Sequence, residues 1–308
     1  MSKASAPGKI ILFGEHAVVY GQPALAVPVT QVQAEVRIDK IFSPGIRINA
    51  PNIQLNEKLD ALASTHPLAA TVRNTLHALE VDSLSSAAIL IRSTIPVASG
   101  LGSGAAVSVA IIRALAKQLK KTLTDEQVSE LAFETEKLYH GTPSGIDNTV
   151  VTYAKPVYFI KNQPIEVLQV KKPFTIVIGD TGIPASTKET VRDVRVQQHK
   201  KPERYETLFA AIGSISDTAR QLIENGMPES LGPLMDENHA LLRNMKVSSP
   251  ELDNLVEAAR EAGALGAKMS GGGRGGNMIA LVQPGKAGAV SRSLKEAGAT
   301  NTIVTRVE

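Results

Sequence analysis

Three ionisable residues of different kinds lie close together near the start of the chain. Lys9, Glu15 and His16 belong to residues 7–21, where a short apolar run leads into a glycine turn. A small anionic substrate needs a cation for its charge and a positioned hydrogen-bonding group for its hydroxyl. Residues 7–21 offer both, and the segment is therefore a candidate substrate site.

A second segment, residues 96–106, has the composition of a phosphate-binding loop. It reads Pro-Val-Ala-Ser-Gly-Leu-Gly-Ser-Gly-Ala-Ala and runs into a predicted helix. Small residues let the backbone approach an anion closely, and free amides at the positive end of a helix face its charge. Ser99 and Ser103 add hydroxyls. The alternative is an ordinary tight turn between a strand and a helix. A Walker loop is excluded, because no Gly-Lys-Ser/Thr follows at the required spacing.

A third glycine-rich segment, residues 270–276, formally contains Gly-x-Gly-x-x-Gly. A dinucleotide fingerprint should open a helix, but the apolar residues that follow predict a strand, so we reject that interpretation. Five glycines in six residues would make an entropically unfavourable hairpin loop. We therefore expect the loop to pack closely against a ligand or another loop, with a bare turn as the alternative. Arg274 either reaches a phosphate or points outward, and the sequence favours neither.

Two carboxylates complete the set of candidate residues. Glu136 lies near the end of a predicted helix over 125–139, and Asp147 lies in a predicted loop over 143–148. Alone, each is more typical of a solvated helix face or a turn. Together they could hold Mg²⁺ and position a hydroxyl, since magnesium prefers one or two carboxylates with phosphate oxygens and water. Glu130 shares the same helix, so spacing alone does not select Glu136.

The hydrophobic pattern predicts the elements that position these residues. A capping box of Thr124 and Gln127 should begin the helix over 125–139. Strands and helices are mixed without regular alternation, which favours an α+β fold. We expect two domains, 1–170 and 171–308. Strands are expected over 9–13, 23–28, 32–38, 87–93, 174–179, 277–282 and 302–307. Helices are expected over 66–79, 107–121, 125–139, 203–224, 228–244, 250–262 and 285–297.

Composition bounds the class of protein. The 308 residues suffice for about two domains, and 43% of them are hydrophobic. The chain has no cysteine, which excludes disulfides, thiolate nucleophiles and Cys-ligated zinc and fits a cytoplasmic protein. No apolar run is long enough for a membrane span, and the first residues lack the apolar core of a secretory signal. The net charge of +3 and the absence of tryptophan argue against nucleic-acid binding.

The motifs, taken in order, resemble those of the GHMP small-molecule kinases over essentially the whole chain. Residues 7–21, 96–106 and 268–282 correspond to the three motifs of that family. Residues 14–21, 136–148 and 180–188 are similar in particular to the branch that acts on mevalonate. Four such segments in the same order make the resemblance specific.

The resemblance implies an activity and a set of roles. It implies ATP-dependent, Mg²⁺-assisted phosphorylation of the primary hydroxyl of (R)-mevalonate to 5-phosphomevalonate, a step of isoprenoid biosynthesis. Lys9 would lie beside the reacting hydroxyl, Asp147 would accept or orient its proton, and Glu136 would ligate Mg²⁺. Glu15 and His16 would lie in or beside the mevalonate pocket. ATP would contact Pro96, Ser99, Gly100, Leu101, Gly102, Ser103, Gly104, Ala105 and Ala106. A supporting loop would contain Gly271, Gly272 and Gly273.

The resemblance also implies a fold and an assembly. The N-terminal domain would be like the second domain of ribosomal protein S5, the C-terminal domain would be ferredoxin-like, and the protein would be a homodimer. One departure concerns the metal, because the family usually has a second serine where this chain has Gly104. We expect Mg²⁺ to rely on Glu136, phosphate oxygens and water, with Ser103 nearby. The alternatives are a GHMP kinase for phosphomevalonate or a sugar, a catalytically silent metabolite sensor, and a nucleic-acid-binding protein.

Overall fold

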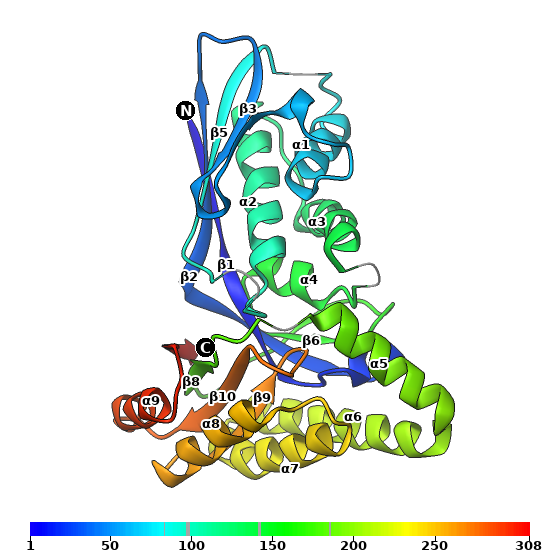
Figure 1. Cartoon of the computed structure of the whole chain (residues 1–308), viewed down its shortest axis with the longest axis vertical. Helices are drawn as coiled ribbons and strands as arrows, with labels where there is room; N and C mark the ends of the chain where they lie inside the picture. Colours follow the sequence, from blue (N-terminus) through cyan, green and yellow to red (C-terminus); the bar gives the residue numbers. More distant parts are fainter. Residues whose placement is uncertain (83, 97–98, 141–142, 185) are drawn as a thin grey trace. The chain divides into compact units, whose positions relative to one another are not determined.

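A computed structural model describes residues 1–82, 84–96, 99–140, 143–184 and 186–308 (Figure 1). Its contacts divide the chain into two compact units. The first unit contains Met1–Gly8, Val32–Val97 and Gly102–Ala154. The second unit contains Lys9–Gln31, Ala98–Leu101 and Lys155–Glu308. Strands β1 (Ser2–Phe13) and β2 (Ala24–Lys40) therefore each contribute to both units. The predicted boundary near residue 170 stays a prediction.

The first unit contains a sheet and four helices that lie on one side of it (Figure 1). Its strand order is β4-β3-β5-β2, with β3 parallel to β5 and the other pairs antiparallel. In β2, Val32, Ala34, Val36 and Ile38 are buried, so the alternation seen in the sequence marks the covered face. The remaining strands are β3 (Gly45–Ala50), β4 (Leu55–Lys58) and β5 (Ser86–Ser93). The helices are α1 (Pro67–Ala78), α2 (Ser103–Gln118), α3 (Asp125–His140) and α4 (Ile146–Tyr153).

The second unit is built on an antiparallel sheet of order β11-β8-β10-β9. Its strands are β8 (Phe174–Asp180), β9 (Gly266–Ser270), β10 (Asn277–Val282) and β11 (Asn301–Val307). Its helices are α5 (Thr187–Lys200), α6 (Pro202–Glu224), α7 (Leu231–Asn244), α8 (Pro250–Glu261) and α9 (Ala287–Glu296). Short strands β6 (Val157–Phe159) and β7 (Glu166–Val167) pair with each other, and β6 pairs with the first residues of β2. Single turns of 3-10 helix complete the elements: Ala17–Tyr20, Pro51–Ile53, Leu59–Ala61 and Pro228–Ser230.

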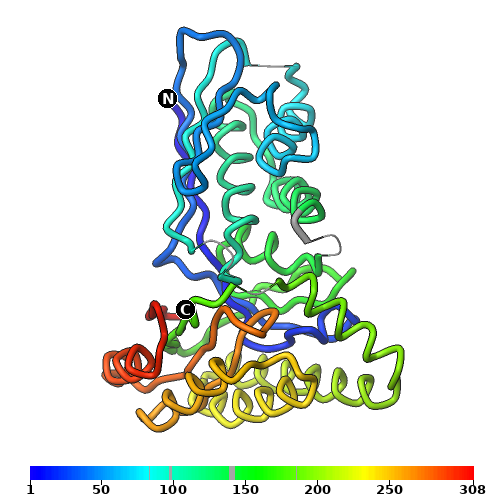
Figure 2. Tube along the Cα trace, in the orientation of Figure 1, coloured from blue at the N-terminus to red at the C-terminus, as the bar shows by residue number. Residues whose placement is uncertain are grey.

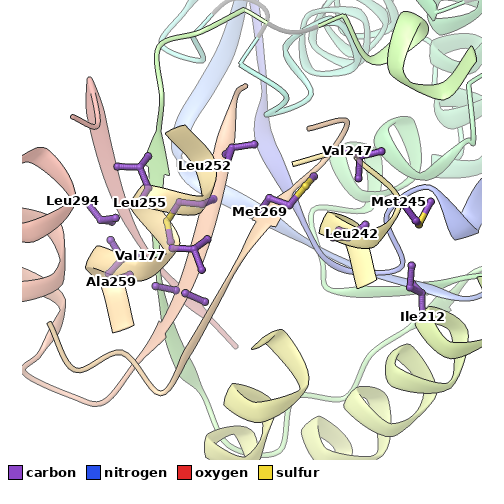
Figure 3. Close-up of a cluster of buried hydrophobic side chains, with 14 of the residues drawn as sticks. Val177, Ile212, Leu242, Met245, Val247, Leu252, Leu255, Ala259, Met269 and Leu294 are labelled. Carbon is purple, nitrogen blue, oxygen red and sulfur yellow. The ribbon is translucent and has the colours of Figure 1, made fainter. Parts of the chain in front are cut away.

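A hydrophobic core of the second unit supports the first glycine turn (Figure 3). Val177 of β8, Met269 of β9, Leu255 of α8 and Leu294 of α9 are almost fully buried and belong to one cluster. Ala17, the residue after His16, is part of the same cluster. The turn that holds Glu15 and His16 is thereby fixed to the core by apolar packing as well as by its polar contacts.

The predicted class and most predicted elements are confirmed. The Thr124 and Gln127 side chains form the predicted capping box, each accepting the other's backbone N–H. Three predictions are wrong. The two strands predicted over 23–28 and 32–38 are one continuous strand, β2. Helix α2 begins at Ser103, four residues earlier than predicted, and Asp147 lies in the first turn of α4 rather than in a loop. No helix in the described part of the chain has the length and apolar character needed to cross a bilayer.

Candidate active site

The backbone of the first glycine turn adopts φ angles that most residues avoid, and at Gly14 it leaves no room for a side chain. Gly14 has φ +96°, and a Cβ atom there would lie 2.5 Å from the backbone of Ala24. His16 also has positive φ, +61°, which is uncommon for a residue with a side chain. Lys9, within the preceding strand β1, is only 4% exposed. The turn therefore holds its ionisable residues in a tight, buried and conformationally restricted arrangement.

Glu15 forms a buried ion pair with Lys268 of β9. Both side chains have no exposed surface, and the Lys268 ammonium donates to Glu15 Oε1 and to the Met269 carbonyl. Burial raises the pKa of the Glu15 carboxyl and lowers the pKa of Lys268, and each charge offsets part of the shift of the other. Glu15 Oε2 is buried without a hydrogen-bond partner among the described residues. Sequence reasoning missed Lys268, although a lysine inside the apolar run of a predicted motif was a signal for it.

His16 is fixed by the third glycine loop. Its Nε2 lies 3.0 Å from the Gly272 carbonyl oxygen, so Nε2 carries the proton and donates it. Burial lowers the pKa of His16 to about 4, and the Gly272 contact opposes that shift only in part. The imidazole is therefore neutral near pH 7. Its Nδ1 is buried and, within the described residues, has no partner, which leaves one acceptor for a bound polar group.

The lowered pKa values of two buried histidines, His16 and His239, predict how the stability of the protein depends on pH. Burial also lowers the pKa of His239, in α7, to about 4, whereas an unfolded histidine titrates near 6.5. Between these values the unfolded chain binds more protons, so the free energy of unfolding should fall as pH drops from 6.5 toward 4. Each histidine contributes up to about 1.4 kcal/mol per pH unit to this fall in the free energy of unfolding.

Urea unfolding at pH 7, 6 and 5 tests this prediction. The free energy of unfolding of His239→Gln should fall less steeply with decreasing pH than that of wild type. His199 is exposed, so the free energy of unfolding of His199→Gln should depend on pH as that of wild type does. An equal pH dependence of all three proteins would contradict the lowered pKa of His239.

The loop over residues 270–276 joins β9 to β10 and packs closely against its neighbours. The dinucleotide interpretation is correctly rejected, because strand β10 follows the loop. Gly273 has φ +79°, and a Cβ atom there would lie 1.9 Å from the Val247 carbonyl oxygen. The Gly276 carbonyl accepts hydrogen bonds from the backbone and the hydroxyl of Thr181, both at 2.9 Å. Ser270 Oγ donates to the Ile11 carbonyl at 2.7 Å. The expectation of close packing is confirmed, and the ordering contacts offset the entropy of the glycines.

The middle of the second glycine loop, residues 99–101, belongs to the second unit as well. The Lys9 backbone N–H donates to the Leu101 carbonyl at 3.0 Å. Asn277, the first residue of β10, donates through its amide to the Ser99 carbonyl. Gly100 has φ +81°, a conformation suited to glycine. Pro96 is half-buried, while residues 97 and 98 lie outside the described residues. Segments of all three glycine motifs are thus hydrogen-bonded within the second unit, and Asn277 is a second residue that sequence reasoning missed.

The rest of this loop forms the N-terminus of α2 in the first unit. Gly102 has φ +71° and precedes the 16-residue helix, whose first residues are Ser103, Gly104, Ala105 and Ala106. Ala105 and Ala106 are buried, whereas Ser103 and Gly104 remain partly accessible. A helix N-terminus has unbonded amides and a positive partial charge. The predicted phosphate-binding residues therefore provide the small side chains and free donors that an anion needs.

The two carboxylates lie on helices of the first unit that pack on one another. Glu136 of α3 is 2% exposed, and Asp147 lies in the first turn of α4, partly buried. Asn148 donates to the backbone and the hydroxyl of Ser129, at 3.1 and 2.8 Å, which fixes α4 against α3. The predicted meeting of the Asp147 carboxylate with the Lys9 ammonium stays a prediction.

The oxygen donors of the first unit fit the requirements of magnesium. Glu136 and Asp147 offer carboxylate oxygens and Ser103 offers a hydroxyl, all hard ligands of the kind that Mg²⁺ takes. Within the described residues, no group of three or more His, Asp or Glu side chains is placed to hold a metal ion alone. A bound Mg²⁺ would then also need phosphate oxygens and water, as expected for Gly104 in place of a serine.

Arg274 lies partly exposed on the third glycine loop, where it forms an ion pair, and a contact of its guanidinium with a phosphate stays a prediction. Its Nη1 donates to Asp193 Oδ2 of α5 at 2.6 Å, and its side chain is 42% exposed. His239 is a packing residue: it is buried, its Nδ1 accepts the Met269 N–H at 3.3 Å, and its Nε2 lies 3.2 Å from Asp253.

Comparison with known proteins places the chain in a family. Residues 68–155 match the family model for the N terminal domain of GHMP kinases, and residues 219–300 match the model for their C terminal domain. The chain is 38% identical to the mevalonate kinase of Pyrococcus abyssi and 39% identical to that of Thermococcus sibiricus; each alignment covers 99% of this chain and 95% of the relative. The chain belongs to the GHMP kinase family.

Solved structures agree with this assignment. The chain superimposes on L. major mevalonate kinase in complex with R-mevalonate with a TM-score of 0.86 and 31% identity, covering 100% of this chain and 96% of that one. It superimposes on the Methanococcus jannaschii mevalonate kinase with a TM-score of 0.83 and 26% identity, covering 99% and 96%. The protein is therefore a kinase with the two-domain GHMP fold, and ATP is its phosphoryl donor. The resemblance inferred from the motifs is confirmed.

Proposed function

We propose that this protein transfers the γ-phosphoryl group of ATP to the primary hydroxyl of (R)-mevalonate and so forms 5-phosphomevalonate. The observation that carries the proposal is the identity of 38–39% to mevalonate kinases over 99% of the chain. Its similarity to Streptococcus pneumoniae phosphomevalonate kinase, at 17% identity, supports the fold alone.

In this proposal Lys9 and Asp147 act on the reacting hydroxyl. The Lys9 ammonium stabilises negative charge as it develops on the oxygen. Asp147 orients the hydroxyl and accepts its proton, early or late along a loose transition state. Glu15 and His16 lie in or beside the mevalonate pocket, where Glu15 Oε2 and His16 Nδ1 are the buried atoms left to bind polar groups.

The phosphates of ATP bind at the second glycine motif. The amides of Ser103, Gly104 and Ala105 at the start of α2 donate to phosphate oxygens, and Gly104 lets the backbone approach them closely. The family resemblance assigns Gly271, Gly272 and Gly273 to a supporting loop, and Gly272 and Gly273 pack closely against Thr187 and Val247 of the second unit. Mg²⁺ is held by Glu136 with Ser103 nearby and, when bound, neutralises phosphate charge.

Glu136→Gln should weaken the use of Mg·ATP without unfolding the protein. An amide is a poorer magnesium ligand than a carboxylate, so the Mg²⁺ concentration for half-maximal rate should rise at least about tenfold. The matched control is Glu130→Gln, which changes an exposed carboxylate on the same helix. An unchanged Mg²⁺ dependence in Glu136→Gln would rule out ligation by this residue.

One assay separates the proposed substrate from its alternatives. ADP release should be measured with mevalonate, phosphomevalonate and galactose, each at saturating ATP and Mg²⁺. The proposal expects turnover with mevalonate and at most background turnover with the other two. Preference for phosphomevalonate or galactose would indicate a different GHMP kinase. No release above background with any of the three would support the metabolite sensor.

We further propose that the protein acts in the cytoplasm as a homodimer and that its domains divide near residue 170. The resemblance to the mevalonate-specific branch supports the dimer, and the absence of cysteine fits a reducing compartment. Sedimentation equilibrium tests the dimer directly, since a mass close to that of one chain at micromolar concentration would contradict it.

A further inference from the structure

The second unit contains a cavity that the proposed reaction does not use. Its volume is about 250 Å³, and it lies where α5, the start of α6, the end of α7 and the third glycine loop come together. Figure 2 shows the chain turning between α5 and α6 at this place. Seven charged or amide side chains line it: Asp193, Gln197, Lys201, Arg204, Asn244, Lys246 and Arg274.

The charges around this cavity are unbalanced. Four of these seven side chains are cationic and one, Asp193, is anionic. The Asp193 carboxylate already pairs with Arg274 at 2.6 Å and with Arg192 at 3.8 Å. In the described part of the chain, no carboxylate lies within ion-pair distance of Lys201, Arg204 or Lys246. The cavity therefore has an excess of positive charge that no described group compensates.

The donors are also held in place. Arg204 Nη2 bonds to the carbonyl and to the side-chain oxygen of Asn244, which caps the end of α7 and leaves Nε and Nη1 to donate elsewhere. Arg274 uses Nη1 on Asp193 and keeps its other donors. Pro202 begins the 23-residue helix α6, whose positive end adds to the field of the cations. Two fixed guanidinium groups lose less entropy on binding an anion than free side chains do.

The shape of the cavity limits the ligand. Its floor is made by the buried side chains of Val194, Tyr205 and Met245; Met245 is labelled in Figure 3. The volume is below that of drug-sized pockets, so the ligand is small. Paired guanidinium and ammonium groups recognise phosphate oxygens. We propose that this cavity binds a small anion of the diphosphate class, carrying at least two negative charges.

Binding of inorganic pyrophosphate tests this proposal by isothermal titration calorimetry. The titration uses the full chain in magnesium-free buffer at low salt, with excess AMPPNP to fill the nucleotide site. Wild type should bind pyrophosphate. Lys201→Ala/Lys246→Ala should raise the Kd for pyrophosphate at least about tenfold, because two cations are lost. The matched control, Lys200→Ala/Lys286→Ala, removes the same charge from exposed positions outside the cavity and should leave the Kd within twofold.

Each outcome decides the proposal. Loss of binding in Lys201→Ala/Lys246→Ala alone supports it. The proposal is overturned if wild type does not bind pyrophosphate or if AMPPNP displaces it. It is also overturned if the Kd of Lys201→Ala/Lys246→Ala is unchanged, or if the Kd rises equally in both double variants. Circular dichroism checks that the variants fold, and ADP release checks that their turnover stays within twofold of wild type. Because the titration needs no mevalonate, its failure would leave the proposed kinase activity standing.

Discussion

Asp147→Asn is expected to lower kcat by roughly 10²–10⁴-fold, the range that a positioned general base contributes. An asparagine keeps the size of the side chain but cannot accept the hydroxyl proton. The change should also leave Lys9 without the carboxylate that we propose beside it. Since Asp147 lies in the first turn of α4, an amide there still suits the helix and folding should be preserved. The measurement is single-turnover phosphoryl transfer to mevalonate at saturating Mg·ATP.

The control for this variant is Asp60→Asn, which makes the same change at an exposed residue of the first unit. Its kcat should stay within twofold of wild type, and the melting temperatures of both variants should stay close to that of wild type. A kcat for Asp147→Asn within twofold of wild type, in folded protein, would refute the proposed role of this carboxylate.

Lys268→Met is expected to lower the free energy of unfolding by about 3–5 kcal/mol, because it leaves the Glu15 carboxylate buried without its cation. The Lys268 side chain has no exposed surface and contacts both Glu15 and the Met269 carbonyl. Methionine fills a similar volume, so the loss reports the charge rather than a cavity. Urea unfolding at pH 7 measures the difference.

A double variant separates the ion pair from packing. Glu15→Gln/Lys268→Met removes both charges, so it should recover a large part of the stability lost in Lys268→Met. If the single and double variants are equally unstable, the loss arises from packing and the argument for the ion pair fails. The control Lys286→Met changes an exposed lysine and should shift the free energy of unfolding by less than about 0.5 kcal/mol.

Sequence patterns predicted most elements because their signals were local. Alternating apolar residues marked β2, and Thr124 with Gln127 marked the start of α3 through contacts three residues apart. Helix α4 was missed because residues 143–145 contain Pro143 and Gly145, which are typical of loops. Gly145 instead precedes the helix with φ +95°, and Thr149 Oγ1 bonds to its carbonyl at 2.7 Å.

Local sequence patterns did not predict the contacts of the candidate site that join residues far apart in the chain. Glycine positions and the three ionisable residues were found from their types and spacing. The partner of Glu15 was not, since Lys268 lies 253 residues away and only pairing in three dimensions brings them together. Asn277, which bonds to Ser99 across 178 residues, was missed for the same reason. Arg274 could not be placed from the sequence because its partner, Asp193, lies 81 residues away on helix α5.

The central claim is that a lysine ammonium and an aspartate carboxylate meet at the alcohol that is phosphorylated. A crystal structure of the protein with mevalonate, AMPPNP and Mg²⁺ tests it most directly. We predict that Lys9 Nζ and an oxygen of Asp147 both lie within about 3.5 Å of the primary hydroxyl oxygen of mevalonate. A complex in which either atom lies more than about 10 Å from that oxygen, far beyond hydrogen-bond reach, would contradict the account.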